Sequence, residues 1–191
     1  FVINSGEKRK VPAFEFYNQD SVLISNKDYL GKVYVVEFFF TTCPTICPIM
    51  TQNLVELQET FKDNEDFGVA SFTINPRYDT PSVLTAYADK YGITDKDWHL
   101  MTGDQEKIYE LAQQGFYIFA TEDQEAPGGF EHSGMFALVD KNGYIRSRED
   151  EFGNPLIYYR GTITEEQGVN SDGETQQMTI LKEDIKKLLA E

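Results

Sequence analysis

Apolar and polar positions alternate along the chain in a way that predicts several short strands. The β-branched and aromatic block at residues 33–40 is the best candidate for a buried central strand, and Glu37 interrupts it without a role that the pattern explains. The runs at 11–16 and 22–24 predict an N-terminal β-hairpin around a turn at Asn18. Further strand-like runs are 67–74, 98–101, 116–119, 135–140, 144–146 and 156–159.

Apolar residues at spacings of three and four predict the helices. One follows Cys47 and carries Leu54, Leu57 and Phe61. Others are expected at 80–91, which opens on a Thr-Pro cap, at 104–114, which a glycine closes, and at 180–189. The order strand, helix, strand, helix, strand, hairpin and helix is that of a thioredoxin-like α/β fold. We therefore expect a central mixed sheet flanked by helices, with the N-terminal β-hairpin beside it.

The remaining segments fix the expected domain organisation. Residues 1–10 are polar without a periodic pattern and are expected to be a tail, and 11–191 a single domain. Within it, 147–177 is expected to be an irregular insertion. The chain begins at Phe1 rather than Met, so we expect a mature form whose upstream signal or anchor has been removed.

Charge excludes some classes of partner. Among 191 residues, Asp and Glu number 32 and Lys and Arg 17, which gives a net charge of −15. Such a chain repels phosphate backbones and anionic lipids, so nucleic-acid binding is not expected. No apolar run approaches the roughly 20 residues that span a bilayer, so contact with a membrane is expected only through an upstream anchor.

The two cysteines carry the candidate chemistry. Cys43 and Cys47 are too few for a disulfide-rich scaffold or a four-cysteine zinc module. They follow the central strand at the mouth of the next helix, where backbone N–H groups and the helix dipole favour a thiolate. Pro44 suits the first helical position, and Pro48 limits bending at Cys47.

Two readings of this pair remain open. Two thiolates suit Cu(I), and one imidazole would complete a three-coordinate copper site, for which we choose His132. The other histidine, His99, lies within a strand-like run and is interpreted as structural. The second reading is a redox pair without a metal, in which Cys43 is the attacking thiolate because it lies nearer the helix mouth.

Several segments together resemble the Sco/SenC family. The resemblance is strongest over Phe38–Pro48, which holds both cysteines, and includes His132 ahead of a strand. It extends to Pro12-Ala13-Phe14, Gly31-Lys32, the run from Ile74 to Pro81 and the run from Val139 to Gly143.

This resemblance implies a thioredoxin fold and a function. Sco/SenC proteins are membrane-tethered copper-binding proteins that help to assemble the dinuclear copper centre of cytochrome c oxidase. By position, Cys43, Cys47 and His132 are then the copper ligands, and Cys43 and Cys47 can cycle between dithiol and disulfide. The implied protein is a metallochaperone that faces the periplasm from the cell envelope. Its expected partner is the copper-bearing oxidase subunit or another thiol protein.

Two positions depart from the family pattern. Asn75 stands where the family usually has Asp, and Glu131 stands where Asp often precedes the histidine. Asp79 is a candidate substitute for the first acid, although its simpler role is at the start of the helix at 80–91.

The alternatives rest on the same cysteines. A thiol–disulfide oxidoreductase of the cell envelope would use Cys43 and Cys47 alone. A peroxiredoxin-like peroxidase is disfavoured because Val36 and Phe40 stand where its proline and threonine should be. A purely structural disulfide would close so short a loop that it would stabilise the fold little.

Overall fold

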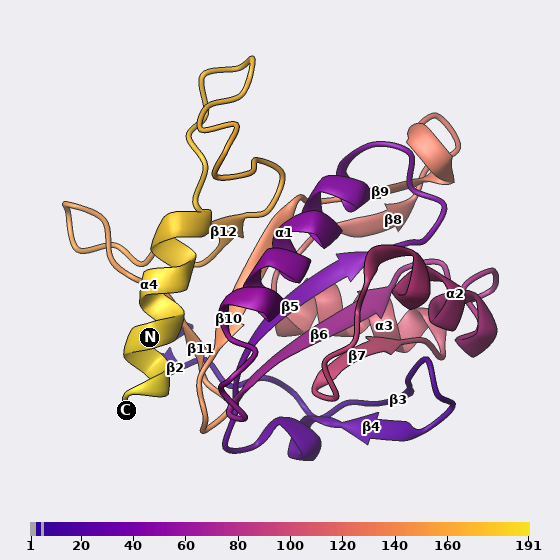
Figure 1. Cartoon of the computed structure of the whole chain (residues 1–191), viewed down its shortest axis with the longest axis horizontal. Helices are drawn as coiled ribbons and strands as arrows, with labels where there is room; N and C mark the ends of the chain where they lie inside the picture. The colour runs from indigo at the N-terminus through magenta and orange to yellow at the C-terminus, as the bar shows by residue number, and fades with distance from the viewer. Residues whose placement is uncertain (1–2, 5) are drawn as a thin grey trace.

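A mixed β-sheet forms the centre of the molecule (Figure 1). The computed structural model describes residues 3–4 and 6–191, and the side chains of residues 3–4, 127 and 130–132 lie outside the description. The strand order is β11-β10-β5-β6-β7, and β12 also pairs with β10. These strands are β5 (Val33–Phe39), β6 (Phe67–Thr73), β7 (Trp98–Met101), β10 (Met135–Val139), β11 (Ile145–Arg146) and β12 (Tyr159–Arg160).

The direction of the strands follows from their connections. Strands β5, β6 and β7 are parallel, and each crossover contains a helix, whereas β10 is antiparallel to β5 and joins β11 through a tight turn at Gly143. Every residue of β5 and β6 is buried, as expected for central strands covered on both faces. The central strand that the sequence predicted is therefore confirmed, and it buries Glu37.

The helices cover the sheet from two sides. Helices α1 and α2 lie on one face, and α3 lies on the other (Figure 1). Thr80 stands at the N-cap position of α2 without a side-chain capping hydrogen bond, and Pro81 opens the helix, as the sequence predicted. The Asp104 side chain caps α3 by accepting a hydrogen bond from the backbone N–H of Lys107. The helices are α1 (Ile46–Thr60), α2 (Pro81–Tyr91), α3 (Gln105–Glu110), which continues into the π-turn η2 (Leu111–Gly115), and α4 (Met178–Leu189), with short 3₁₀ turns η1 (Asn26–Tyr29) and η3 (Pro127–Gly129).

Two sets of side chains build the core, one on each face of the sheet. Phe38 stacks on Phe72 with ring centroids 5.2 Å apart and also meets Phe116, which follows η2. On the opposite face, Phe39 packs on Tyr87 of α2 with centroids 5.4 Å apart. Neighbours along β5 thus point to opposite faces, which places Glu37 on the same face as Phe39, beneath α1 and α2.

The smaller elements confirm some expectations and revise others. The N-terminal hairpin is present as β3 (Glu15–Tyr17) paired with β4 (Leu23–Ser25). Residues 116–119 form no strand; the extended pieces instead lie at β8 (Ala120–Glu122) and β9 (Phe130–His132), which pair with each other. Residues 147–177 are mostly irregular, with several turns and bends and with Tyr159 at the start of β12.

The segment expected to be a tail has its own structure. It forms a two-stranded ribbon of β1 (Ile3–Asn4) and β2 (Glu7–Lys8). Arg9 is buried and donates hydrogen bonds to the carbonyl oxygens of Gly115 at 3.0 Å and Gln114 at 2.7 Å. The expectation of a tail fails here because a tertiary contact, rather than local periodicity, holds the segment.

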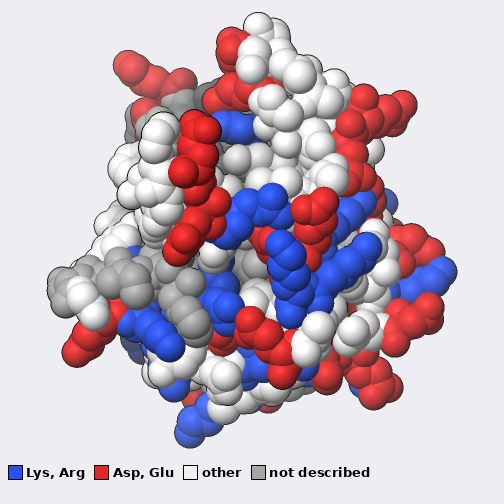
Figure 2. Space-filling view, turned by 90° about the vertical axis from the view of Figure 1, so that its left-hand side faces the viewer, with Lys and Arg blue, Asp and Glu red and all other residues white. Residues whose placement is uncertain are grey.

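Ion pairs fasten the 147–177 segment to α4. Arg148 pairs with Asp184 at 2.9 Å, and Lys182 pairs with Glu165 at 2.8 Å. On the face that carries α4, basic and acidic side chains lie side by side (Figure 2). The acidic excess of the chain is therefore locally compensated on this face.

Candidate metal centre and dithiol site

The cysteines lie where β5 leaves the sheet and α1 begins. The backbone N–H of Cys43 donates to the carbonyl oxygen of Phe40 at 3.2 Å, which closes a turn directly after the strand. Helix α1 begins at Ile46, so Pro44 lies in the loop rather than at the first helical position that the sequence predicted. Pro48 is the third residue of α1, where a backbone N–H has no intrahelical partner and proline costs no hydrogen bond. Cys47 is thus helical, whereas Cys43 stands in the loop before the helix.

Both cysteines are free, and both are shielded from solvent. Cys43 is 7% exposed and Cys47 is 1% exposed. The two side chains are hydrogen-bonded to each other. The Sγ of Cys43 also lies 3.8 Å from the hydroxyl of Thr45. The pair is therefore preassembled, with Cys43 as the more accessible sulfur.

Burial decides the protonation of Cys47. Removal from water raises the pKa of the Cys47 thiol well above its ordinary value, and the hydrogen bond with Cys43 raises it further. A hydrogen bond with the backbone of Phe40 opposes this increase. Cys47 therefore holds its proton until a metal or a sulfur atom takes its electron pair.

Asp79 fastens the start of the cysteine loop. Its carboxylate is fully buried and accepts hydrogen bonds from the backbone N–H and the hydroxyl of Thr41. It also accepts one from the hydroxyl of Thr73, at 2.6 Å. The side chain therefore joins the ends of β5 and β6, in addition to its place near the start of α2. Asn75, at the position where the family usually has Asp, donates its backbone N–H to Thr73 Oγ1 at 3.0 Å.

The backbone of His132 ends β9, opposite Ala120 of β8, rather than lying in the loop that the sequence suggested. Its side chain and that of Glu131 lie outside the described residues. The segments on either side of His132 can be placed. A Cβ added at Gly128 would stand 2.7 Å from the Phe40 ring and 3.2 Å from Pro44, and one at Gly134 would stand 3.7 Å from Ile46.

These approaches bring the β8–β9 hairpin to the cysteine segment. In Figure 1 the hairpin lies beside the N-terminal end of α1. Among the side chains that the structure describes, no group of three His, Cys, Asp or Glu residues could hold a metal ion. Cys43 and Cys47 supply two soft donors, and the set of three with His132 stays a prediction.

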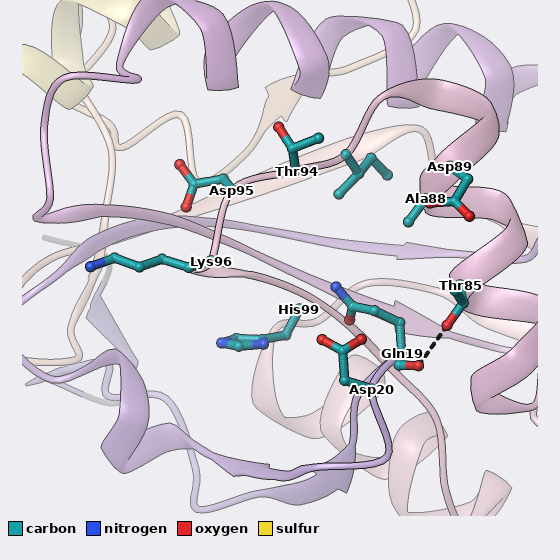
Figure 3. Close-up of a pocket in the computed structure, with 10 residues that line it drawn as sticks. Gln19, Asp20, Thr85, Ala88, Asp89, Thr94, Asp95, Lys96 and His99 are labelled. Atoms are coloured by element: carbon teal, nitrogen blue, oxygen red, sulfur yellow. Dashed lines mark hydrogen bonds between the residues drawn. The ribbon is translucent and has the colours of Figure 1, made fainter.

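The second histidine belongs to a different part of the molecule. His99 lies on the edge strand β7, and its Nδ1 accepts a hydrogen bond from the Asn18 side chain at 3.0 Å. Burial lowers its pKa against the opposing effect of nearby carboxylates, of which Asp97 is the strongest. It borders a polar pocket of about 190 Å³ (Figure 3), where Thr85 donates to the carbonyl oxygen of Gln19.

Comparison with known proteins places this chain in a family. The SCO1/SenC family model matches residues 3–158. The chain belongs to the SCO1/SenC family. The SCO1 protein homolog of Bacillus subtilis is 33% identical over 138 residues, which is 71% of each chain. The thioredoxin-like α/β fold that the sequence predicted is confirmed by the solved Sco structures.

Solved Sco structures cover nearly the whole chain. A SCO1/SenC family lipoprotein from Bacillus anthracis has a TM-score of 0.78 and 30% identity and covers 96% of both chains. The structure of BsSco, described as a member of the Sco family of cytochrome c oxidase assembly proteins with a disulfide switch, has a TM-score of 0.74 and 27% identity and covers 99% of this chain and 98% of its own. ScoI of Bradyrhizobium japonicum, solved with copper bound, has a TM-score of 0.70 and 18% identity. The match covers 94% of this chain and 99% of ScoI, so the two proteins share the fold.

The structure gives contacts to two acids that the sequence singled out without a settled role. Asp79 holds the loop before Cys43, and Glu37 lies buried on the face beneath α1. The sequence shows Glu37 as the one carboxylate within an otherwise apolar strand, but it does not show which residues of other elements surround it. Within the described residues, no helix is long and apolar enough to cross a bilayer.

Proposed function

We propose that this Sco protein is a copper metallochaperone that holds copper through the sulfurs of Cys43 and Cys47 and the imidazole of His132. It delivers copper to, or matures, the dinuclear copper site of cytochrome c oxidase. The observation that carries the proposal is the buried, hydrogen-bonded thiol pair, together with the approach of the segments flanking His132 to Phe40, Pro44 and Ile46 on either side of Cys43. Copper-bound ScoI, with the same fold, supports copper as the cargo.

The chemistry of the donors fits Cu(I). Two thiolates and one imidazole form a soft, low-coordinate set, and a site shielded from water disfavours oxidation of the bound ion. Binding requires both thiols to lose their protons, so copper affinity rises with pH. The raised pKa of the Cys47 thiol makes this proton release the step that the protein environment opposes most.

The same comparison supports a proposed location. A relative that is 30% identical is described as a lipoprotein, which supports a place in the cell envelope facing the periplasm with an upstream anchor. The copper-bearing subunit of the oxidase would then be reached from the same side of the membrane.

Titration of the freshly reduced protein with Cu(I), against a competing chelator, tests the three-ligand site. One equivalent should bind tightly, Cys43→Ser and Cys47→Ser should abolish tight binding, and His132→Ala should weaken it by tenfold or more, about 1.4 kcal/mol. His99→Gln is the matched control, because it removes the other histidine of the chain, and should leave the affinity unchanged. Equal affinity in His132→Ala and wild type would contradict a ligand role for His132.

Delivery needs its own test. Copper-loaded protein mixed with the copper-free, soluble domain of the oxidase subunit should transfer the ion and generate the absorbance of the dinuclear centre. Copper that stays on the Sco protein, under conditions where free copper does form the centre, would contradict delivery.

A thiol–disulfide oxidoreductase is the second candidate. The hydrogen-bonded sulfurs favour it, as does the disulfide switch described for BsSco. This function predicts that Cys43→Ser abolishes reduction of a protein disulfide while His132→Ala has little effect. Lack of turnover by the metal-free, reduced wild type would exclude it.

A further inference from the structure

The turn between β3 and β4 covers the outer edge of the sheet. Strand β7 is the last strand in the sheet order, so one of its sides faces away from the other strands. The side chain of Gln19 takes the place of a neighbouring strand there: Nε2 donates to the carbonyl oxygen of Trp98 at 3.1 Å, and Oε1 accepts from the backbone N–H of Leu100 at 2.9 Å. Tyr17 and Thr102 exchange two backbone hydrogen bonds, at 2.8 and 3.1 Å. The turn thereby occupies backbone groups that would otherwise be a template for pairing with another chain.

Asn18 holds this turn together, and its hydrogen bonds fix the orientation of its side-chain amide. Oδ1 accepts from the backbone N–H groups of Asp20 at 2.9 Å and Val22 at 3.0 Å. Because the oxygen is committed to these two donors, the NH₂ group faces β7, where Nδ2 lies 3.0 Å from Nδ1 of His99. An NH₂ group can only donate, so Nδ1 of His99 is the acceptor and the neutral ring carries its proton on Nε2.

Protonation of His99 is incompatible with this contact. A protonated imidazole has an N–H on both nitrogens and no acceptor. Two donors, Asn18 Nδ2 and His99 Nδ1, would then face each other. The amide of Asn18 cannot turn its oxygen toward the ring without giving up both backbone hydrogen bonds of the turn. Asn18 is 4% exposed, so loss of the contact is not simply made good by bulk water.

The surroundings of the ring favour its charged form once the contact is broken. The charged groups around it belong to every element packed against it: Asp20 of the turn, Asp28 of η1, Asp89 of α2, and Asp95, Lys96 and Asp97 ahead of β7 (Figure 3). Lys32 pairs with Asp97 at 3.2 Å, and the Tyr29 ring packs edge-on against the imidazole with centroids 5.7 Å apart. Carboxylates outnumber amines in this group, so an imidazolium that leaves Asn18 has acids to interact with.

We propose that His99 is an acid-sensitive lock on the β3–β4 turn: the neutral ring holds the turn on the edge of β7, and uptake of one proton releases it. Gln19 follows Asn18 directly and moves with it, so the N–H of Leu100 loses its acceptor and the edge is uncovered. The opening is local, because it breaks the contacts of the turn and leaves the sheet paired. It takes place away from the cysteine site and depends on neither copper nor dithiol chemistry.

The ionisation of His99 agrees with the direction of this switch. Burial lowers its pKa below the ordinary value of 6.5, although the nearby carboxylates, Asp97 foremost, oppose the shift. A lowered pKa means that the folded, locked state favours the neutral ring. The lock is therefore complete above about pH 6.5 and is lost as the pH falls through the folded-state pKa.

Amide hydrogen exchange of the metal-free protein, followed residue by residue by NMR at pH 7.5 and pH 4.5, measures the release. The amides of Leu100 and Thr102 report it because their acceptors belong to Gln19 and Tyr17. After correction for the intrinsic exchange rate, their protection in wild type should fall by about tenfold at pH 4.5. The amide of Ile74, which donates to Phe39 in the centre of the sheet, should keep its protection and is the internal control.

Two substitutions separate a lock from a merely structural contact. His99→Gln keeps an oxygen that can accept from Asn18 but takes up no proton, so the fall in protection should disappear. Asn18→Asp keeps an oxygen for the two backbone N–H groups of the turn and turns a second oxygen toward His99. A protonated ring can donate to that oxygen, so protection of Leu100 at pH 4.5 should equal or exceed that at pH 7.5.

Each contrary result would overturn the proposal. These results are unchanged protection of Leu100 in wild type at the two pH values, an equal fall in wild type and His99→Gln, and a parallel loss at Ile74, which would show global rather than local opening. If circular dichroism shows that the variants are unfolded, the ¹⁵N spectrum of the wild-type ring decides. At pH 7.5 the proton of His99 should be on Nε2, and a proton on Nδ1 would contradict the lock.

Discussion

Asp79 holds Thr41 by two hydrogen bonds, one from its backbone N–H and one from its hydroxyl. Thr41 is the second residue after β5 and stands two residues before Cys43, whereas Asp79 lies between β6 and α2. The same carboxylate also accepts the hydroxyl of Thr73. One buried side chain thus sets where the cysteine loop departs from the sheet, and the position of Cys43 depends on it.

Replacing Asp79 by alanine should destabilise the fold and loosen the cysteine loop. The change leaves the buried hydroxyl of Thr73 and the N–H of Thr41 without their acceptor, so the free energy of unfolding should fall by about 2–4 kcal/mol. Denaturant unfolding measures this loss, and alkylation of the folded protein should modify Cys43 faster than in wild type. Asp89→Ala, which removes an exposed acid from α2, is the control and should change stability by less than about 0.5 kcal/mol. Wild-type stability and alkylation rate in Asp79→Ala would show that the loop is held by other contacts.

Glu37 should make the protein less stable as the pH rises. Its folded-state pKa of about 8 lies above the ordinary value of 4.5, so the protonated form is favoured in the folded state. Its contribution is fully present below about pH 4.5 and is lost as the pH rises through 8, on the order of 5 kcal/mol in total. Unfolding followed by the fluorescence of Trp98 should therefore show Glu37→Gln gaining stability relative to wild type between pH 5 and pH 9. A pH-independent difference between the two proteins would contradict a raised pKa.

The local sequence pattern was sufficient to predict most of the fold, because the long strands and helices have clear hydrophobic patterns. A run of apolar residues buried on both faces predicted β5 and β6, and the Thr80-Pro81 cap predicted the start of α2. Strand β9 was missed because three residues next to two glycines carry no periodicity. β9 forms because it pairs with β8, and the local sequence does not reveal this pairing.

The candidate site, too, has a part that the sequence predicted and a part that only the structure shows. The spacing of Cys43 and Cys47 and the family resemblance were enough to predict a thiol pair. The fastening of Thr41 by Asp79 and the burial of Glu37 beneath α1 and α2 required the packing of the elements on the sheet. Sequence patterns report which face a residue occupies, but not which residue of another element meets it there.

The ion pair of Arg148 with Asp184 should stabilise the protein mainly above about pH 4. Burial raises the pKa of Asp184, but hydrogen bonds from Arg148 and the Tyr159 hydroxyl outweigh this effect and hold the pKa below its ordinary value of 3.8. A lowered carboxyl pKa stabilises the folded state above the ordinary value, and this stability is lost as the pH falls through the folded-state pKa. Arg148→Ala should therefore cost about 2–3 kcal/mol at pH 7 and progressively less below about pH 4.

The control for Arg148 is another arginine of the same region. Arg160 pairs with Glu174 at 3.3 Å, and the Glu174 side chain is 47% exposed. Arg160→Ala should therefore cost less than about 1 kcal/mol at pH 7, because solvent screens an exposed pair. Urea unfolding of both variants at pH 7 and pH 3 measures the difference, and equal losses at pH 7 would contradict a special role for the buried Asp184.

Gly134 should tolerate no side chain while Thr162 is present. A Cβ at Gly134 would stand 2.1 Å from Thr162 Cγ2, closer than any van der Waals contact, and Thr162 lies in the segment that packs beside α1. Gly134→Ala should lower the free energy of unfolding by about 1–3 kcal/mol through this overlap. Thr162→Ser removes the overlapping methyl group, so the double variant Gly134→Ala/Thr162→Ser should recover most of the loss, and denaturant unfolding of the four proteins gives the coupling. Additive effects of the two substitutions would mean that another contact at Gly134, such as the approach to Ile46, sets the cost.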